Sequence, residues 1–183
     1  MDLAQKRLQF LHDLLPRASR FAALTDDTTT PLRASRISDL QAAASTRGVS
    51  IEIVTASDNR EIDAAFASLA QKRIDALWVD SFGRFVIRRL QLAHLATYYH
   101  LPAIYPERQF TEIGGLMSYG PDFLDQIRQA GIYTGRVLKG EKPSDLPVMR
   151  PTKFQFVINK QTARIFGIEV PPTLLAIADE VIE

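Results

Sequence analysis

Three carboxylates follow predicted strands and could hold a metal ion together. Asp26 and Asp27 come directly after the first predicted strand, and Asp80 follows the third. Carboxylates at neighbouring strand ends can bind Mg²⁺ and accept a phosphoryl group, as in a response-regulator receiver domain. Such a domain also needs a Ser or Thr after the fourth strand and a Lys after the fifth, and the sequence has neither. A receiver that is phosphorylated on Asp80 therefore stands only as an alternative.

Aromatic and polar side chains are expected at the same edge of the sheet. Ligands of parallel sheets bind at the carboxyl ends of the strands. An aromatic ring there could cover the apolar part of a small ligand, and a carboxylate could pair with its amine. Each aromatic residue alone could equally pack in the core, but their conjunction favours a binding cleft. The candidate ligand-binding residues are Asp80, Ser81, Tyr105, Glu107, Ser118 and Tyr119.

The common signatures of enzymes and metal sites are missing from the sequence. There is no cysteine, which excludes disulfides, thiolate metal sites and cysteine nucleophiles. The histidines His12, His94 and His100 include no pair four residues apart that could bind a metal from one helix face. No nucleophile elbow, Walker loop or dinucleotide fingerprint occurs. We therefore expect no enzymatic activity, no metal ion and no cofactor.

Strands and helices alternate over the first two thirds of the chain. Short apolar or β-branched runs predict five strands, and amphipathic stretches with polar caps or glycine stops predict the helices between them. Short loops between such elements imply a parallel sheet with helices on both faces, an α/β doubly wound fold. The predicted strands are 21–25, 49–56, 74–79, 102–105 and 116–119, and the predicted helices include 3–15, 32–47, one after Ser57-Asp58, and 83–99.

The character of the chain changes after residue 119. A strong helix over 121–139 is followed by the proline-rich segment 141–152, which is expected to be extended. A sixth strand (154–158), one helical turn (162–166) and a final helix (173–182) complete the chain. We therefore predict two parts, an α/β domain over 1–119 and a crossover helix, connection, strand and C-terminal helix over 120–183.

Charge and hydropathy limit the partners of the chain. The net charge of +1 gives no electrostatic reason to expect nucleic acid as a partner. No stretch reaches the roughly 18 continuous apolar residues of a membrane span. Asp2, Lys6, Arg7 and Asp13 interrupt any apolar core of a signal peptide near the start. On this basis the polypeptide is expected to carry no export signal.

Several longer motifs of the sequence are distinctive in combination. The first is Leu101-Pro-Ala-Ile-Tyr-Pro-Glu-Arg-Gln-Phe110, followed by Gly114-Gly-Leu-Met-Ser-Tyr-Gly120. Others are Leu138-Lys-Gly-Glu-Lys-Pro-Ser-Asp-Leu-Pro-Val148, Pro151-Thr-Lys-Phe154 and Val157-Ile-Asn159. The last are Pro171-Pro-Thr-Leu-Leu175 and Ala178-Asp-Glu-Val-Ile182. Together they resemble the ABC-transporter substrate-binding proteins of the tryptophan/tyrosine-uptake-like type, and the resemblance covers essentially the whole chain.

This resemblance implies a fold and a function. The family has two α/β lobes of the type I periplasmic-binding-protein fold, which close on a ligand by hinge motion. The chain resembles the second lobe and the C-terminal crossover, and most of a first lobe is missing. The resemblance implies a solute-binding component of an ABC importer, here truncated, that binds a small organic solute such as an amino acid. It also implies a permease partner and a periplasmic or lipoprotein-anchored location.

The helix at 121–139 also predicts self-association. Its apolar residues Phe123, Leu124, Ile127 and Leu138 would pack on a first lobe in the complete family. Without that lobe, a two-fold homodimer could cover them. The alternative to the dimer is a monomer in which the helix folds back on its own sheet. The alternative to solute binding is a truncated structural domain that folds and dimerises but binds no ligand.

Overall fold

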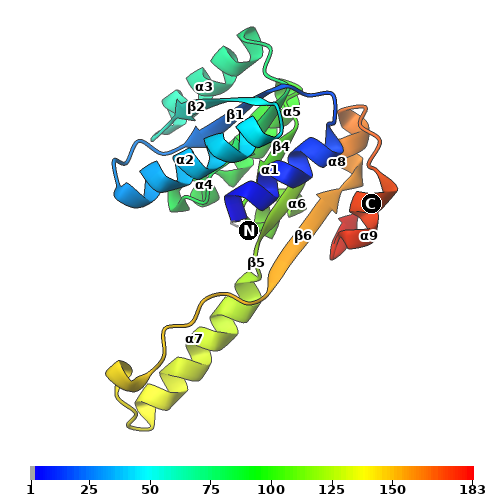
Figure 1. Cartoon of the computed structure of the whole chain (residues 1–183). Coiled ribbons are helices and arrows are strands. Elements are labelled where there is room, and N and C mark those ends of the chain that lie inside the picture. Colours follow the sequence, from blue (N-terminus) through cyan, green and yellow to red (C-terminus); the bar gives the residue numbers. More distant parts are fainter. Residues whose placement is uncertain (1–2) are drawn as a thin grey trace.

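A seven-stranded sheet forms the body of the protein in the computed structural model, which describes residues 3–183 (Figure 1). The spatial order of the strands is β2-β1-β3-β4-β5-β6-β7. Neighbouring strands are parallel except for β5 and β6, which are antiparallel. The strands are β1 (Arg20–Thr25), β2 (Ser50–Thr55), β3 (Ala76–Val79), β4 (Ala103–Tyr105), β5 (Met117–Pro121), β6 (Phe154–Asn159) and β7 (Glu180–Ile182).

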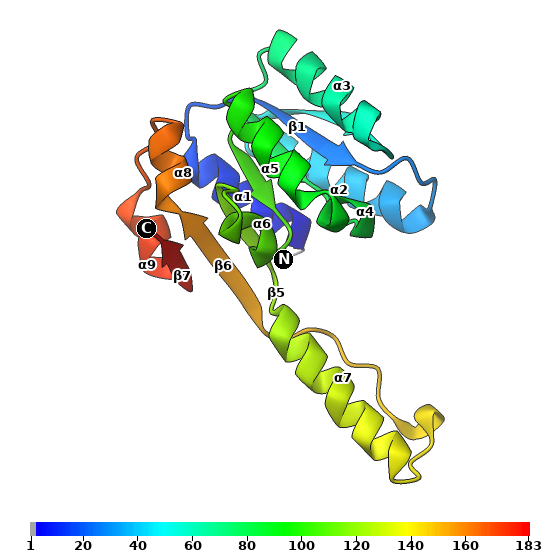
Figure 2. The same ribbon diagram turned by 180° about the vertical axis from the view of Figure 1, so that it is seen from behind.

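Helices cover both faces of this sheet, which confirms the predicted α/β doubly wound class. Helices α1 and α2 lie over one face (Figure 1), and α3 to α6 lie over the other (Figure 2). The helices are α1 (Leu3–Leu14), α2 (Pro31–Thr46), α3 (Asn59–Gln71), α4 (Gly83–Ile87), α5 (Arg89–Tyr98), α6 (Arg108–Glu112), α7 (Phe123–Leu138), α8 (Lys160–Ile165) and α9 (Pro172–Ile177), with a 3-10 turn at Pro143–Asp145.

Each face of the sheet has its own apolar core. Leu8 and Leu11 of α1 pack with Trp78 of β3 on one side. On the other side Phe66 of α3 and Phe110 of α6 pack with buried residues of β3 and β4. The alternation of strand side chains between the two faces explains why the central strands have apolar residues at almost every position.

Capping side chains fix where three of the helices begin. Thr30 accepts from the Arg33 amide at 3.2 Å, Asp58 from the Glu61 amide at 2.9 Å, and Asp122 from the Asp125 amide at 3.1 Å. These bonds satisfy amides that have no acceptor within the first helical turn. The helix predicted to begin after Ser57-Asp58 is therefore confirmed, with Asp58 as its cap.

Three elements differ from their prediction. The helix expected over 83–99 is divided into α4 and α5 at Arg88. The short helix α6 was not predicted, because five residues are too few to show a periodic pattern. The final helix ends at Ile177 because Ala178 has an extended backbone, and residues 180–182 form β7 instead.

A long arm projects from the sheet between β5 and β6 (Figures 1 and 2). We define the arm as residues 122–153, which comprise α7, the 3-10 turn and an extended return segment, 146–153. The return segment runs beside α7, and the Tyr133 hydroxyl donates to the Pro147 carbonyl at 2.7 Å. The strands beyond the arm continue the sheet of the body, so the predicted division at residue 119 falls inside β5.

Candidate functional site

Arginines from two helices bind the loops that follow β1 and β3. Arg36 of α2 donates to Asp80 at 2.7 Å, and the Asp80 side chain is only 3% exposed. Asp80 also accepts from the Ser81 amide at 2.7 Å. Sequence reasoning predicted Asp80 as a ligand anchor, whereas the structure gives it a protein partner of opposite charge.

The neighbouring carboxylate, Asp26, has a similar environment. Arg33 lies 3.6 Å from Asp26 and donates to the Thr25 hydroxyl at 2.8 Å. Thr28 also donates to Asp26. Arg33 and Arg36 are one helical turn apart and were not identified from the sequence. The sequence did place both arginines in the first two turns of a helix that follows a buried strand, and such positions lie near the carboxyl edge of the sheet.

Arg7 of α1 reaches the same edge from beneath the sheet. Its guanidinium lies 4.6 Å from the ring of Trp78 and donates to the Val79 carbonyl at 2.9 Å and the Ser81 hydroxyl at 3.1 Å. Burial of a guanidinium is favourable only when such partners replace its hydration. Arg7 therefore fixes the end of β3 and the exposed Ser81 in place.

The two hydroxyl groups predicted on β4 and β5 are buried. Tyr105 and Ser118 occupy paired positions on neighbouring strands, and each is at most 1% exposed. Neither hydroxyl has a hydrogen-bond partner among residues 3–183. Tyr105 stacks on Phe110 at 4.7 Å, and burial raises the pKa of its phenol. Both residues belong to the packing of this lobe, beneath the surface that a solute could touch.

Tyr119 lies on the opposite face from this pair. It is partly buried and packs edge-on against Phe10 of α1 at 5.1 Å, with Phe154 and Phe156 of β6 nearby. The structure therefore brings Asp80 and Ser81 together at the carboxyl edge, and it separates Tyr119 from Tyr105 and Ser118.

Glu107 follows β4 and is half-buried at the base of the arm. Burial raises the pKa of its carboxyl, and Arg7 and Arg89 offset part of this effect. Glu107 also lines a cavity of about 190 Å³ between α6 and the start of α7, together with Arg108, Glu112 and Phe123.

Replacement of Glu107 by Gln is expected to stabilise the protein at pH 7. A raised pKa in the folded state means that folding favours the protonated carboxyl, so the wild type loses stability as the pH rises above about 4.3, the usual value for Glu. The amide created by this substitution carries no charge to bury. The difference in free energy of unfolding between the variant and the wild type should therefore disappear near pH 4. Urea unfolding at both pH values measures this difference. Glu169→Gln, at an exposed glutamate, is the control, and an equal effect in both variants would contradict the explanation.

The carboxyl edge does not have the geometry of the receiver alternative. Within residues 3–183 no three carboxylate or histidine side chains are placed to hold one metal ion. Asp80 is instead paired with Arg36 and Asp26 with Arg33. In these pairs each carboxylate faces an arginine of α2, and among the described residues neither belongs to a group of three that could hold a metal ion.

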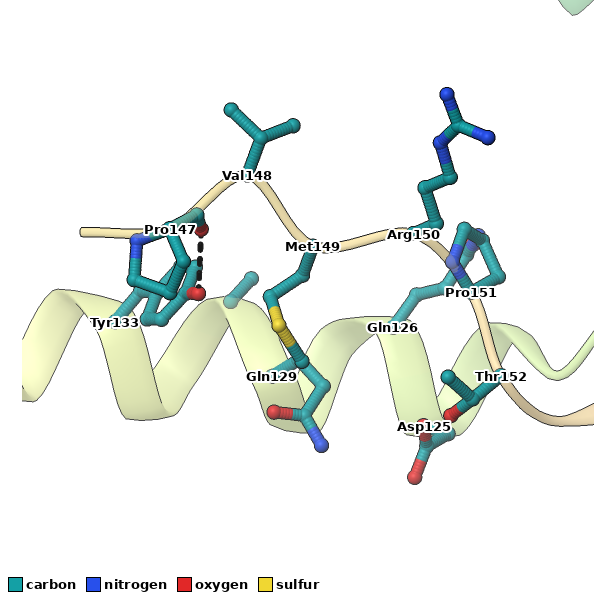
Figure 3. Close-up of a pocket in the computed structure, with 11 residues that line it drawn as sticks. Asp125, Gln126, Gln129, Tyr133, Pro147, Val148, Met149, Arg150, Pro151 and Thr152 are labelled. Carbon is teal, nitrogen blue, oxygen red and sulfur yellow. Dashed lines mark hydrogen bonds between the residues drawn. The ribbon is translucent and has the colours of Figure 1, made fainter.

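A groove of about 330 Å³ lies on the arm between α7 and the return segment (Figure 3). Tyr133 closes one end, Met149 points toward the helix, and Asp125 lies at the other end. The groove contains none of the residues that were predicted to bind a ligand. We therefore regard it as the contact between the two segments of the arm.

The comparison with protein families gives a match over almost the whole chain. The model of the ABC transporter substrate binding protein family matches residues 1–182. The chain belongs to this family. Its resemblance to substrate-binding proteins, noted from the motifs at 101–120 and 138–182, is thereby confirmed. No curated protein matches the sequence.

Three solved structures have the same fold as this family member. An ABC domain from Streptococcus pneumoniae in complex with L-Trp is 26% identical, with a TM-score of 0.86 over 99% of this chain and 62% of its own. A conserved domain protein from Vibrio cholerae is 21% identical, with a TM-score of 0.85 over 97% of this chain and 60% of its own. A ligand-free, open substrate-binding protein with adhesive properties from Clostridium difficile is 22% identical, with a TM-score of 0.68 over 97% of this chain and 59% of its own.

The chain spans about six tenths of the length of these three proteins. It consists of the α/β body around the seven-stranded sheet and the arm that projects from it. No helix among residues 3–183 combines the length and apolar composition needed to cross a membrane.

Proposed function

We propose that the chain is the second lobe of a solute-binding protein that delivers a small organic solute, such as an amino acid, to an ABC importer. The solute would bind at the carboxyl edge of the sheet, beside Asp80 and Ser81, and no reaction would be catalysed. The family match over residues 1–182 carries this proposal. The L-Trp complex of the Streptococcus pneumoniae relative, which is 26% identical, supports an amino acid as the solute.

The expected partners and location follow from the same role. An importer needs a permease, and we propose that the complete two-lobed protein docks on one. We also propose that it acts on the outer side of the cytoplasmic membrane, either in the periplasm or anchored as a lipoprotein. The arm would then belong to the interface between the two lobes, because it projects from the edge where β5 and β6 end.

A thermal-shift screen against amino acids and related solutes tests the solute-binding role. The chain is used both alone and joined to the first lobe of the Streptococcus pneumoniae relative. A solute present at a hundred times its dissociation constant stabilises the folded state by about 2.7 kcal/mol. For a protein of this size we expect the melting temperature to rise by about 5–10 °C.

The control for this screen is Arg47→Gln, at the far end of α2 from the carboxyl edge. This variant should respond to the same solutes as the wild type. If no amino acid or related solute stabilises either form of the protein, the proposed function is wrong.

We propose further that the chain by itself forms a homodimer through α7. Large apolar side chains on the arm are exposed, including Leu124 at 72%, Ile127 at 55% and Leu138 at 82%. These residues form one stripe along the helix with Gly131 and Gly135, and we call this set the arm stripe. The helix face opposite the stripe carries Tyr133 and contacts the return segment.

The glycines of the arm stripe support a helix as the partner. A methyl group added at Gly131 or Gly135 would meet no atom within 4 Å in this chain. Glycines spaced four residues apart allow two helix backbones to approach closely. A second copy of the arm provides such a helix, and a two-fold axis would place the same stripe on both sides of the contact.

A further inference from the structure

Arg33 and Arg36 have hydrogen-bond donors that the protein does not use. A guanidinium has five N–H groups. Within the described residues Arg36 uses one amino group for Asp80, and Arg33 uses one for the Thr25 hydroxyl. The two side chains are 18% and 29% exposed, and the Nε atom of Arg33 is buried without a hydrogen-bond partner among the described residues. Both lie on the same side of α2 because they are three residues apart.

The two buried carboxylates at this edge are, by contrast, already balanced. Asp26 and Asp80 are 4% and 3% exposed and face Arg33 and Arg36. A ligand amine that bound Asp80 would compete with a guanidinium for a charge that is removed from water. Such competition would separate Arg36 from the buried carboxylate with which it pairs, which is unfavourable. The edge is therefore poorly suited to bind a cation.

The start of α2 adds to the attraction for a negative group. The helix begins at Pro31 behind the Thr30 cap, and its first turns carry both arginines toward the loop after β1. The amino end of a helix has a partial positive charge. A planar carboxylate also matches the fork of guanidinium donors.

We infer that this lobe binds its solute through the carboxylate, which Arg33 and Arg36 hold at the carboxyl edge of β1 and β3. The solute class is therefore carboxylic acids, and the amine of an amino acid is bound elsewhere. Asp80 and Asp26 act as positioning residues that orient the guanidinium groups. The inference rests on the proposed function and replaces the expectation that Asp80 pairs with a ligand amine.

Two indole compounds of opposite charge test this assignment on the 183-residue chain. The probes are 3-indolepropionate, which keeps the carboxylate, and tryptamine, which keeps the amine. NMR titration follows the guanidinium Nε–H signals of Arg33 and Arg36. We expect 3-indolepropionate to shift both signals. It should also bind about tenfold or more tightly than tryptamine, because tryptamine has no carboxylate to accept charged hydrogen bonds from the arginines. Inorganic phosphate should not displace the acid.

A paired substitution separates binding from folding. Arg36→Gln alone leaves Asp80 buried without its counter-charge, so it is compared with Arg36→Gln/Asp80→Asn, which removes both charges together. The double variant should remain folded and bind 3-indolepropionate about tenfold more weakly, with binding of tryptamine unchanged. Arg47→Gln is the matched control and should bind both probes as the wild type does.

The outcomes distinguish this inference from the function on which it rests. Equal binding of the two probes, displacement by phosphate, or an unchanged double variant would overturn the carboxylate assignment. If the solute screen is positive but neither probe shifts the arginine signals, the solute binds elsewhere and the assignment also fails. If the solute screen is negative as well, the proposed function fails with it.

Discussion

Light scattering of the chain at micromolar concentration should give about twice the 20.5 kDa mass of one copy. The reason is the arm stripe, whose large side chains are 55–82% exposed in a single chain. Burial of one such side chain contributes roughly 1.5–3 kcal/mol. A two-fold contact buries each of the three twice, which contributes roughly 9–18 kcal/mol against an estimated cost of association of about 4–15 kcal/mol. A mass near 20.5 kDa would show that the chain is a monomer.

A charge in the arm stripe should separate the two copies. Ile127→Glu places a carboxylate twice in a two-fold interface, and a loss of about 2 kcal/mol at each position weakens the dimer roughly a thousandfold. The matched control is Ile87→Glu on α4, which is 78% exposed and lies on the body rather than the arm. The control should keep the mass of the wild type. Dissociation by both variants would point to a contact outside the arm.

Gly120→Ala should strongly destabilise the protein. A methyl group at this position would lie 1.8 Å from the carbonyl oxygen of Pro106 and 3.0 Å from its carbonyl carbon. These are backbone atoms of the loop between β4 and α6, so no side chain can move aside. Such overpacking costs about 3 kcal/mol at the upper end of its usual range. We expect the melting temperature to fall by about 6–12 °C.

Gly83→Ala is the control for this substitution. Its added methyl group meets no atom within 4 Å, and Gly83 begins the short helix α4. Calorimetry of both variants at the same protein concentration makes the comparison independent of dimerisation. A melting temperature of Gly120→Ala within about 2 °C of the control would mean that the Pro106 loop can move away.

The order of strands and helices could be predicted because it depends on local patterns. Apolar runs such as Phe21–Thr25 form strands with both faces buried, and polar caps such as Asp58 mark helix starts. The antiparallel direction of β6 could not be predicted, because it depends on the return of the chain from the arm. The final strand β7 also depends on tertiary contacts, since it pairs with β6 over only three positions.

The position of the candidate site followed from topology, but its chemistry did not. Strand order alone places Asp80 and Ser81 at the carboxyl edge. The arginines that pair with the aspartates come from α2, and the sequence places them in the first turns of a helix after a strand without showing which carboxylate each one contacts. The orientation of Tyr105 was equally hidden, because a strand residue just before a loop can point into either core.

The ladder between β5 and β6 has a consequence for the order in which the chain is synthesised. Residues 3–121 leave the ribosome before the arm and already contain the five parallel strands with α1 to α6. Strand β6 can pair with β5 only after the 32 residues of the arm have followed. The cost of closing such a loop rises only with the logarithm of its length. The body therefore assembles in two stages, and the paired contacts of Arg108 with Glu180, at 2.6 and 3.0 Å, join the last strand to a helix made some seventy residues earlier.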